Sequence, residues 1–409
     1  DQFGTLVSVT GQGRRVRSVE EIPEAMSEAF TRLTRGRPRP YVLEVPLDVL
    51  SDEAEIDPVS AELPPVAAPG ADAIGSAAAL IRGAARPLLL AGGGAQGAAS
   101  DVVALAERLD APVVLTSNGV GVVPADHPLY LGGADVFKEW ADRSDLLIAV
   151  GTRFGQMSLR SWKGPPERLI HLDIDPTVIG SQHAPDVALL GDARAGLTAL
   201  LDALGENPRG SGGSVWPNDS APEGGRQVSE DDRQSIEILN TLRDSLSRDA
   251  VLTYDMNMVC YRAPRAFPVY VPRGIMGPSC YGSLGFAVPA AIGAKLACPS
   301  REVVALCGDG GFFFTAQELS TACQQTLCLP IIVFNDNAYA SIRGLQDRDR
   351  GGRRIGVELK NPDFLQFAES FGVSGARVAS SRALGEALGQ ALASDMPTLI
   401  EVDVEAYEF

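Results

Sequence analysis

Residues 303–337 read VVALCGDGGFFFTAQELSTACQQTLCLPIIVFNDN, and the order of elements in this stretch decides the fold. Two short runs that are almost entirely apolar, 303–307 and 331–334, predict strands that are buried on both faces. Between them, Thr315 and Glu318 have the spacing of a capping box, which predicts that a helix begins there. A strand, a helix and a second strand in this order form a βαβ unit, so the two strands are parallel and end at the same edge of the sheet.

An aspartate follows each of these strands. Asp309 lies in the turn Gly308-Asp309-Gly310-Gly311, and Asp336 lies in Asn335-Asp336-Asn337. Because open α/β sheets bind ligands at the carboxyl ends of their strands, we expect the two carboxylates to lie side by side at a ligand site. Mg²⁺ takes one or two carboxylates together with phosphate oxygens and water, and glycine allows a diphosphate to approach backbone N–H groups. The pair predicts a Mg²⁺–diphosphate site, whereas either aspartate taken alone is equally typical of a turn or a helix cap.

The composition excludes several classes of protein. The 409 residues are 45% hydrophobic and 21% charged, which is typical of globular proteins. The 35 Lys and Arg against 52 Asp and Glu give a formal net charge of −17, which argues against nucleic acid or an anionic membrane as the main partner. No apolar run approaches the length of a membrane-spanning helix. The cysteines lack the spacing of a metal site or a disulfide framework and predict reduced core thiols in a cytoplasmic protein. They are Cys260, Cys280, Cys298, Cys307, Cys323 and Cys328.

Shifts in composition divide the chain into five parts. We expect 1–50 to be the C-terminal tail of a domain, 51–70 a linker, 71–201 a central α/β domain, 202–234 a second linker and 235–409 the domain with the Mg²⁺–diphosphate site. Predicted strands alternate with helices in both larger parts, which predicts an α/β fold of parallel sheets flanked by helices. The predicted strands are 87–91, 112–116, 146–150 and 169–174 in the first and 251–253, 303–307, 331–334 and 398–404 in the second.

The segment 1–50 is too short to fold alone. Ser18 and Glu21 have capping-box spacing before a helical stripe, and residues 41–45 predict a strand. One helix and one strand cannot enclose a core. We therefore interpret this segment as the tail of a domain whose first part lies outside the sequence, in preference to an N-terminal arm.

A second glycine-rich stretch lies upstream. Residues 277–294 read GPSCYGSLGFAVPAAIGA and predict a glycine-rich turn that enters a helix of small residues. For the helical part, 290–294, close packing against neighbouring elements explains the small side chains without a ligand.

Together, the two glycine-rich stretches resemble the thiamine-diphosphate-dependent enzymes, in particular the group of acetohydroxyacid (acetolactate) synthase and benzoylformate decarboxylase. The GDG and NDN pair is similar to the family's diphosphate-binding motif. This resemblance implies that Asp309, Asp336 and the carbonyl of Ala338 hold Mg²⁺. Many members have Asn at the Asp336 position, and Asp supplies the same ligand oxygen. The implied cofactor-binding residues are Gly308, Asp309, Gly310, Gly311, Asn335 and Tyr339.

For the run 282–286 (GSLGF), the resemblance implies a place beneath the thiazolium ring. Leu284 is then the apolar wedge that bends the cofactor into a V shape, and the Gly282 carbonyl accepts a hydrogen bond from its 4′-amino group. Asn257 and Met258 depart from the family, since many members have Gly-Gln there. Further stretches that resemble the family cover nearly the whole chain. YVLEVPLD at 41–48 resembles the end of the family's pyrimidine-binding domain, so the resemblance implies that 1–50 is the C-terminal tail of such a domain. GTRF at 151–154 and HLDIDP at 171–176 resemble its central domain, and NPDF at 361–364 and LIEV at 399–402 resemble the final helix and strand of its diphosphate domain.

The resemblance also implies a residue that this sequence does not contain. In the family, a glutamate early in the pyrimidine-binding domain protonates the aminopyrimidine, and that part would precede Asp1. The family builds each site between the pyrimidine domain of one protomer and the diphosphate domain of another. We therefore expect a homo-oligomer, or a hetero-oligomer with a chain that carries the pyrimidine domain. A split enzyme, a clipped chain and an incomplete sequence all fit.

The function implied by the resemblance is a thiamine-diphosphate- and Mg²⁺-dependent carboligase, like acetolactate synthase, that acts on a 2-oxo acid. A simple 2-oxo acid decarboxylase of the same family is the alternative among enzymes. A non-catalytic cofactor-binding subunit is the alternative from another class. A Mg²⁺ phosphohydrolase with Asp309 as nucleophile is disfavoured, because that chemistry expects a second aspartate where Gly311 stands.

Three further signals receive structural interpretations. GGGAQG at 92–97 matches a dinucleotide fingerprint, but no acidic residue follows the next strand to bind a ribose. Some family members bind FAD or ADP in this domain and others bind neither, so FAD stays an alternative. The widely spaced His127, His171 and His183 are interpreted as structural. The basic run 343–354 predicts a solvated loop, with a lid over a substrate carboxylate as the alternative.

Overall fold

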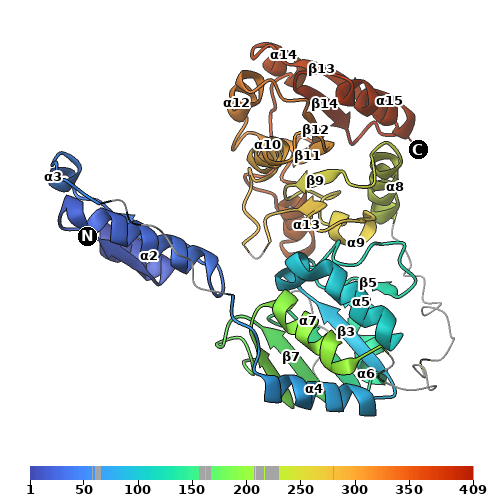
Figure 1. Ribbon diagram of the computed structural model, residues 1–409. Helices are drawn as coiled ribbons and strands as arrows, with labels where there is room; N and C mark the ends of the chain where they lie inside the picture. Colours follow the sequence, from blue (N-terminus) through green and yellow to red (C-terminus); the bar gives the residue numbers. More distant parts are fainter. Residues whose placement is uncertain are drawn as a thin grey trace.

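The chain folds into three parts that follow one another along the sequence (Figure 1). The computed structural model describes residues 1–57, 59, 66–155, 162, 167–206, 208, 216, 230–279 and 281–408. Much of the two predicted linkers, 51–70 and 202–234, and Cys280 lie outside the described residues. Figure 1 shows the N-terminal part standing apart from the body, in which the central and C-terminal parts are stacked.

The N-terminal part contains a two-stranded parallel sheet whose strands are joined by a crossover helix. A small core of Val16, Ala25 and Val49 holds it together. Apolar side chains on its helices stay exposed, Val9 and Leu47 most of all. The interpretation of this part as the tail of a domain stays a prediction. Its elements are α1 (Gln2–Thr10), β1 (Gly13–Arg15), α2 (Ile22–Thr34), β2 (Val42–Glu44) and α3 (Leu47–Leu50).

The capping box expected at Ser18 does not form. The Ser18 hydroxyl hydrogen-bonds to the Glu20 carboxylate and thereby lowers the pKa of Glu20. The Glu21 carboxylate accepts a hydrogen bond from the backbone N–H of Arg17 at 3.1 Å. One 3₁₀ turn therefore precedes α2, because the hydroxyl that should cap the α-helix is bonded to a neighbouring side chain.

The central part is a six-stranded parallel sheet in the order β5-β4-β3-β6-β7-β8. Successive residues of its central strands are buried on opposite faces, which explains their uninterrupted apolar runs. The strands are β3 (Pro87–Ala91), β4 (Val113–Leu115), β5 (Tyr130–Gly132), β6 (Leu146–Val150), β7 (Leu169–Asp173) and β8 (Val187–Leu190). Helices α4 (Ala71–Gly83), α5 (Ala99–Leu109) and α7 (Ala193–Leu204) cover one face, and α6 (Phe137–Arg143) covers the other.

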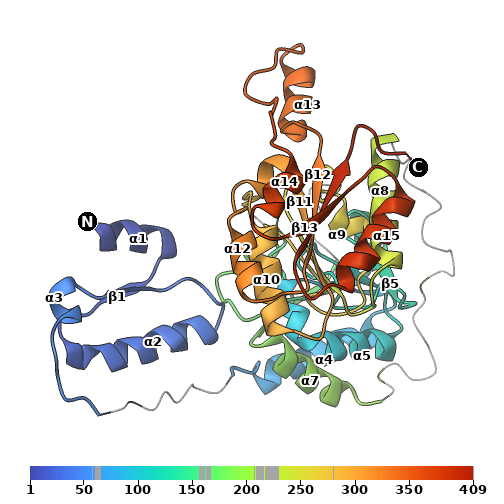
Figure 2. The same cartoon turned by 90° about the horizontal axis from the view of Figure 1, so that it is seen from above.

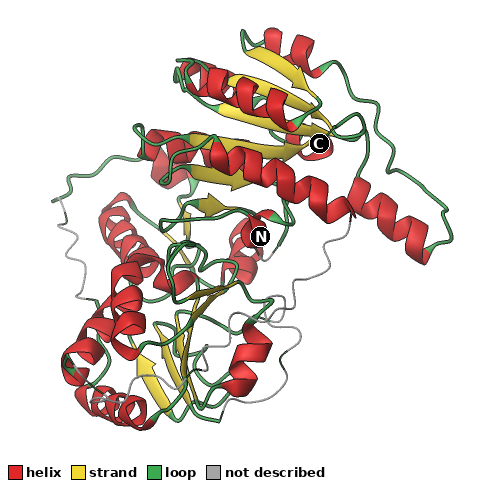
Figure 3. Ribbon diagram, turned by 90° about the vertical axis from the view of Figure 1, so that its right-hand side faces the viewer, coloured by secondary structure: helices red, strands yellow, loops and turns green. Residues whose placement is uncertain are grey.

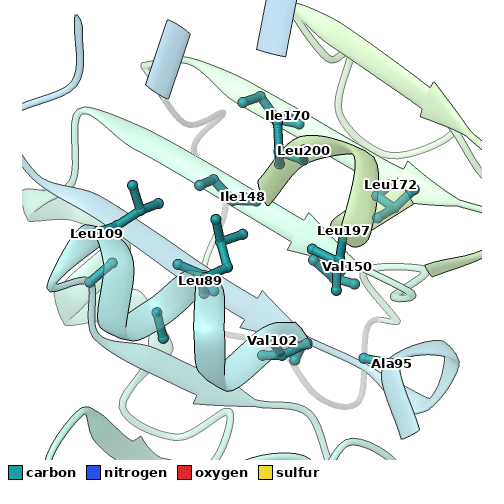
Figure 4. Close-up of a cluster of buried hydrophobic side chains, with 14 of the residues drawn as sticks. Leu89, Ala95, Val102, Leu109, Ile148, Val150, Ile170, Leu172, Leu197 and Leu200 are labelled. Atoms are coloured by element: carbon teal, nitrogen blue, oxygen red, sulfur yellow. The ribbon is translucent and has the colours of Figure 1, made fainter. Parts of the chain in front are cut away.

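Figure 4 shows the packing between this sheet and the helices α5 and α7. Leu89, Ile148 and Ile170, from three adjacent strands, share one buried cluster with Leu109 of α5 and Leu200 of α7. Each is at most 1% exposed, and burial of such a side chain stabilises a fold by roughly 2 kcal/mol. This layer fixes the strand ends that face the C-terminal part.

The C-terminal part is a second six-stranded parallel sheet, in the order β10-β9-β11-β12-β14-β13, and Figure 3 shows its strands between layers of helices. Its strands are β9 (Val251–Tyr254), β10 (Ile275–Met276), β11 (Val303–Gly308), β12 (Pro330–Asn335), β13 (Ser374–Val378) and β14 (Thr398–Asp403). Helices α10 (Ala287–Ala297), α12 (Glu318–Gln324) and α14 (Phe364–Glu369) cover one face, and α8 (Glu230–Asp244), α9 (Ala263–Ala266) and α15 (Ser381–Leu392) the other. The short α11 (Asp309–Phe312) follows β11, and α13 (Ala340–Asp349) follows β12.

The predicted βαβ unit is present. β11 and β12 are adjacent and parallel, and Gly308 pairs with Phe334 near their carboxyl ends. The chain therefore leaves both strands at the same edge of the sheet. The helix between them begins later than predicted, at Glu318, because the Thr315 hydroxyl donates to the Gly285 carbonyl at 3.2 Å instead of capping it.

Four strands of the two six-stranded sheets were not predicted: β5, β8, β10 and β13. All four are edge strands. An edge strand has one neighbour and is partly exposed, so it does not need the continuous apolar run by which a central strand is predicted. The fold class of parallel sheets flanked by helices agrees with the prediction. The strands missed in these two sheets are all edge strands, and in residues 1–50, where one helix and one strand were predicted, the structure also has α1, β1 and α3.

Two arginines attach the N-terminal part to the central one. Arg37 and Arg39 pair with the Asp175 carboxylate at 3.3 and 2.8 Å. Burial opposes ionisation of Asp175, but hydrogen bonds from Thr177 and the two guanidinium groups outweigh it and hold its pKa below the ordinary value. This buried carboxylate explains why the HLDIDP stretch carries an acidic residue after β7.

The central and C-terminal parts also contact each other directly. Arg248 pairs with Asp126 at 2.8 Å, and the backbone N–H of Arg273 donates to Gln96 Oε1 at 3.0 Å. Among the described helices, none is both long and apolar enough to cross a lipid bilayer.

Candidate functional site

A cavity of about 240 Å³ lies at the carboxyl edge of the C-terminal sheet. Its walls come from the ends of β9, β11 and β12, from the turn 282–285 and from the beginning of α13. Met256, Met258 and Ile342 add apolar surface to it. The structure brings nine of the predicted site residues together around this cavity: Gly282, Leu284, Gly308, Asp309, Gly310, Gly311, Asp336, Ala338 and Tyr339.

Asp309 is the first residue of α11, directly after the buried strand β11. Its carboxylate is nearly inaccessible, since the residue is 3% exposed. Oδ1 accepts a hydrogen bond from the backbone N–H of Gly310 at 2.7 Å, and Oδ2 accepts one from Asn361 Nδ2 at 2.7 Å. Burial raises the pKa of Asp309, against these hydrogen bonds, which lower it.

Asp336 is the second carboxylate at this edge. Burial and then the charge of Asp309 raise its pKa to about 6, and a hydrogen bond from the N–H of Ala338 at 3.2 Å only partly offsets them. A buried and a partly buried carboxylate that repel each other are stabilised by a cation between them. Within the described residues, no group of three or more His, Cys, Asp and Glu side chains is arranged to hold a metal ion. Further ligands therefore have to come from backbone, water or a bound molecule.

The backbone at Ala338 is held in a defined orientation. Asn337 has a positive φ of 51°, a conformation that asparagine tolerates better than most residues. The N–H of Leu359 donates to the Asn337 carbonyl at 2.8 Å, and the N–H of Tyr339 donates to the Val357 carbonyl at 2.8 Å. Because carbonyl directions alternate along an extended backbone, the Ala338 carbonyl points away from this segment. It is available to the cavity that Ala338 lines.

The turn 282–285 requires its glycines, since Gly282 and Gly285 have φ values of 70° and 78°. Asp255, directly after β9, holds this turn, because its carboxylate accepts a hydrogen bond from the N–H of Gly285 at 2.8 Å. The residue is 1% exposed. A Cβ on Gly311 would lie 3.1 Å from Asp255 Oδ2, so the same carboxylate lies against the GDGG turn. Sequence reasoning missed Asp255, although it ends a buried apolar strand just as Asp309 does.

Asn335 is the one predicted site residue that the described cavity lining does not include. Its side chain lies behind the cavity, where Nδ2 donates to Glu401 Oε1 at 2.9 Å and Oδ1 accepts from Asn361 Nδ2 at 3.0 Å. The two residues that depart from the family, Asn257 and Met258, do line the cavity.

The glycines at 92–97 have a packing explanation. A Cβ on Gly92 would lie 2.3 Å from the Gly151 carbonyl oxygen, and one on Gly94 would lie 2.8 Å from Gly151 Cα. They allow the short 3₁₀ helix after β3 to contact the loop after β6. A larger cavity of about 850 Å³ lies between this loop region and the C-terminal part and includes Tyr254 and Tyr261. Occupation of this region by FAD stays an alternative prediction.

The discounted side chains have structural partners. His171 Nε2 lies 2.9 Å from the Thr152 carbonyl oxygen, and the Phe154 ring lies 5.2 Å from the rings of both His171 and His183. The N–H of Leu129 donates to His127 Nδ1 at 3.2 Å. The basic run 343–354 lies mostly on α13, which projects from the body (Figure 2). Arg343 and Arg354 of this run pair with Glu358, and Arg354 also pairs with Asp347. A role as a lid stays a prediction.

Comparison with known proteins identifies the family. The model for the thiamine pyrophosphate enzyme central domain matches residues 74–200, and the model for the C-terminal TPP binding domain matches residues 257–402. Over its whole length, the chain is 32% identical to the probable acetolactate synthase large subunit of Methanocaldococcus jannaschii, and the alignment covers 74% of that protein. The chain belongs to the thiamine pyrophosphate enzymes.

Other thiamine pyrophosphate enzymes to which the chain is similar carry two kinds of name. The whole chain is 32% identical to 76% of the acetolactate synthase isozyme 2 large subunit of Escherichia coli. Over 91% of its length, the chain is 34% identical to the probable 2-ketoarginine decarboxylase AruI of Pseudomonas aeruginosa, and the alignment covers 68% of that protein. The predicted family, α/β fold and thiamine-diphosphate-dependent enzyme class are confirmed. The TPP-binding match contains all residues that line the described cavity except Met256 and Val404.

Proposed function

We propose that this chain is a thiamine-diphosphate- and Mg²⁺-dependent carboligase of the acetolactate synthase type, acting on a 2-oxo acid. The observation that carries this proposal is the single cavity that joins Asp309, Asp336, the GDGG turn and the turn with Leu284. The proposal includes a pyrimidine-binding domain supplied by another polypeptide or by a segment outside the given sequence. The large-subunit names of several relatives support an assembly of more than one kind of chain.

The donor set fits a divalent cation that carries a diphosphate. We assign the carboxylates of Asp309 and Asp336 and the carbonyl of Ala338 to Mg²⁺, which prefers oxygen ligands and retains places for phosphate oxygens. Gly310 and Gly311, in the first turn after β11, are assigned to the diphosphate. We assign the contact at Gly311 to its backbone N–H, because the N–H of Gly310 donates to Asp309 Oδ1. A bound cation also offsets the mutual repulsion that raises the pKa of Asp336.

When bound, thiamine diphosphate supplies the carbanion that adds to the keto carbon of a 2-oxo acid and allows CO₂ to leave. The protein's part is to hold the cofactor in a productive shape and to keep water away. We assign the Gly282 carbonyl to the cofactor's 4′-amino group, and the half-buried Leu284 to its bending. Asp255 holds the turn 282–285 through its hydrogen bond with the N–H of Gly285 and lies beside Gly311.

Leu284→Ala is expected to lower kcat by about 10- to 100-fold, because a misplaced reacting group costs about this much even when binding persists. The dissociation constant of thiamine diphosphate should change by less than about fivefold, since its diphosphate contacts are untouched. Steady-state kinetics and calorimetric cofactor titrations measure the two quantities. Leu284→Met, which keeps the apolar bulk, serves as the matched control. A Leu284→Ala variant with wild-type kcat would contradict the wedge assignment.

A second candidate function is decarboxylation of a 2-oxo acid without ligation, which similarity to the 2-ketoarginine decarboxylase favours. The two functions differ in what captures the intermediate after CO₂ leaves. The test incubates the chain with thiamine diphosphate, Mg²⁺ and pyruvate or 2-ketoarginine, with and without a polypeptide that carries a pyrimidine-binding domain. Acetolactate as product supports the carboligase, and a free aldehyde with CO₂ supports the decarboxylase. Cofactor binding without turnover in every combination supports a non-catalytic subunit.

The enzyme proposal fails if calorimetry detects no thiamine diphosphate binding in the presence of Mg²⁺, even with the complementing polypeptide. Activity of the isolated chain against pyruvate would count against complementation by a second polypeptide.

A further inference from the structure

The side-chain amide of Asn361 lies at the centre of the polar groups behind the cavity. Its Nδ2 donates to Asp309 Oδ2 at 2.7 Å and to Asn335 Oδ1 at 3.0 Å, with Asn337 Oδ1 at 3.4 Å. Asn361 and Asp309 are 52 residues apart, so the fold alone brings them together. The backbone at Asn361 is restricted by Pro362, which disfavours helical φ and ψ in the preceding residue. The Asn361 side chain therefore extends from a backbone of restricted conformation.

A buried carboxylate determines which way the amide groups face. Glu401, on β14, is 4% exposed. Its Oε1 accepts from Asn335 Nδ2 at 2.9 Å, and its Oε2 accepts from Arg377 Nε at 2.8 Å. Because a carboxylate accepts hydrogen bonds and does not donate them, it requires the NH₂ group of Asn335 on its side. Asn335 Oδ1 then faces Asn361 and requires the NH₂ group of Asn361, the same group that the Asp309 carboxylate requires.

We propose that Asn361 and Glu401 are positioning residues for the metal ligand Asp309. Asn361 holds one oxygen of the Asp309 carboxylate, and the N–H of Gly310 holds the other at 2.7 Å. Glu401, anchored by Arg377, fixes the orientation of the amides between them. A ligand that is fixed before the ion arrives loses less conformational freedom on binding. This inference rests on the proposed function, since it concerns a residue assigned there to Mg²⁺.

Loss of a side chain that hydrogen-bonds to a metal ligand typically weakens metal affinity by about 10- to 100-fold. We expect Asn361→Ala to raise the dissociation constant of Mg²⁺ at least about tenfold. Glu401→Gln keeps the shape of the side chain but can donate to Asn335, so the amides lose their fixed direction. It should raise the same constant by a smaller factor. Asn361→Gln, which keeps an amide on a longer stem, should restore part of the affinity.

The experiment titrates Mg²⁺ calorimetrically into each variant at saturating thiamine diphosphate, together with any complementing polypeptide that the wild type requires. Electron paramagnetic resonance of bound Mn²⁺ gives a readout that does not depend on turnover. The apparent KM for Mg²⁺ should rise, while kcat at saturating Mg²⁺ stays within about twofold, a split that general destabilisation does not produce. The matched control is Asn240→Ala, the same substitution at an exposed position of α8, which should leave the Mg²⁺ constant unchanged.

The outcomes separate this inference from the proposed function. A wild type that binds neither Mg²⁺ nor thiamine diphosphate overturns both. A wild type that binds both, with Asn361→Ala and Glu401→Gln showing wild-type Mg²⁺ constants, overturns the positioning inference alone. If Asn361→Ala does not fold, the isosteric variant Glu401→Gln serves as the test. An unchanged dissociation constant of Mg²⁺ in that variant is sufficient to overturn the inference.

Discussion

Asp309→Ala is expected to abolish Mg²⁺-dependent binding of thiamine diphosphate, with a loss of affinity of at least about 100-fold. The reason is that a carboxylate contributes both charge and a ligand oxygen to the site, and Mg²⁺ is bound by few protein ligands. Calorimetric titration of thiamine diphosphate at fixed Mg²⁺ measures the effect. Titration without Mg²⁺ should show little difference between the variant and the wild type.

The stability of Asp309→Ala separates loss of a ligand from loss of the fold. Burial raises the pKa of Asp309, so the ionised carboxylate is held in the apo protein at a cost. Removing it should leave the thermal midpoint of the apo protein unchanged or slightly higher, while the stabilisation by Mg²⁺ and cofactor disappears. Asp202→Ala, at an exposed position of α7, is the matched control and should bind as the wild type does. Unchanged cofactor affinity in Asp309→Ala would refute the ligand assignment.

Asp336→Asn is expected to remove most of the pH dependence of Mg²⁺ binding. The pKa of Asp336 is raised to about 6, first by burial and then by the charge of Asp309. Because Mg²⁺ binds the ionised form, its affinity for the wild type should fall roughly tenfold per pH unit below about pH 6. An amide supplies a ligand oxygen without titrating, so the variant should show a flatter profile and weaker binding near pH 8. Calorimetric dissociation constants of Mg²⁺ for the wild type and for Asp336→Asn, measured between about pH 5 and 8, test this prediction.

The same shift predicts an effect on the stability of the apo protein. A carboxyl group with a raised pKa in the folded state destabilises the fold once it ionises, so stability is lost as the pH rises from about 4 to about 6. The loss is on the order of 2 kcal/mol for this partly exposed side chain. Asp336→Asn should therefore raise the thermal midpoint of the apo protein near pH 7.5 and hardly change it near pH 4. Equal midpoint changes at both pH values, or a similar change in the control Asp202→Asn, would contradict the assignment.

Much of the fold could be predicted because its central strands are buried on both faces. Val303–Gly308 and Pro330–Asn335 are apolar almost throughout, and this local pattern is sufficient to predict both strands and their parallel order. The edge strands were missed because partial exposure removes that pattern. The helix that begins at Glu318 was predicted to begin earlier in the chain, because the Thr315 hydroxyl donates to a carbonyl 30 residues away instead of capping the helix.

The sequence by itself determined which chemistry gathers at the sheet edge. Asp309 and Asp336 directly follow strands of one βαβ unit, so local patterning and the parallel rule place them together without knowledge of any other contact. Only the tertiary structure decided how they are held. Asp255, Asn361 and Glu401 come from other strands and loops, and each is a polar residue whose burial cannot be seen in the sequence around it. Which polar side chains become buried partners depends on strand order and on distances between segments far apart in the chain, and only the folded chain fixes these.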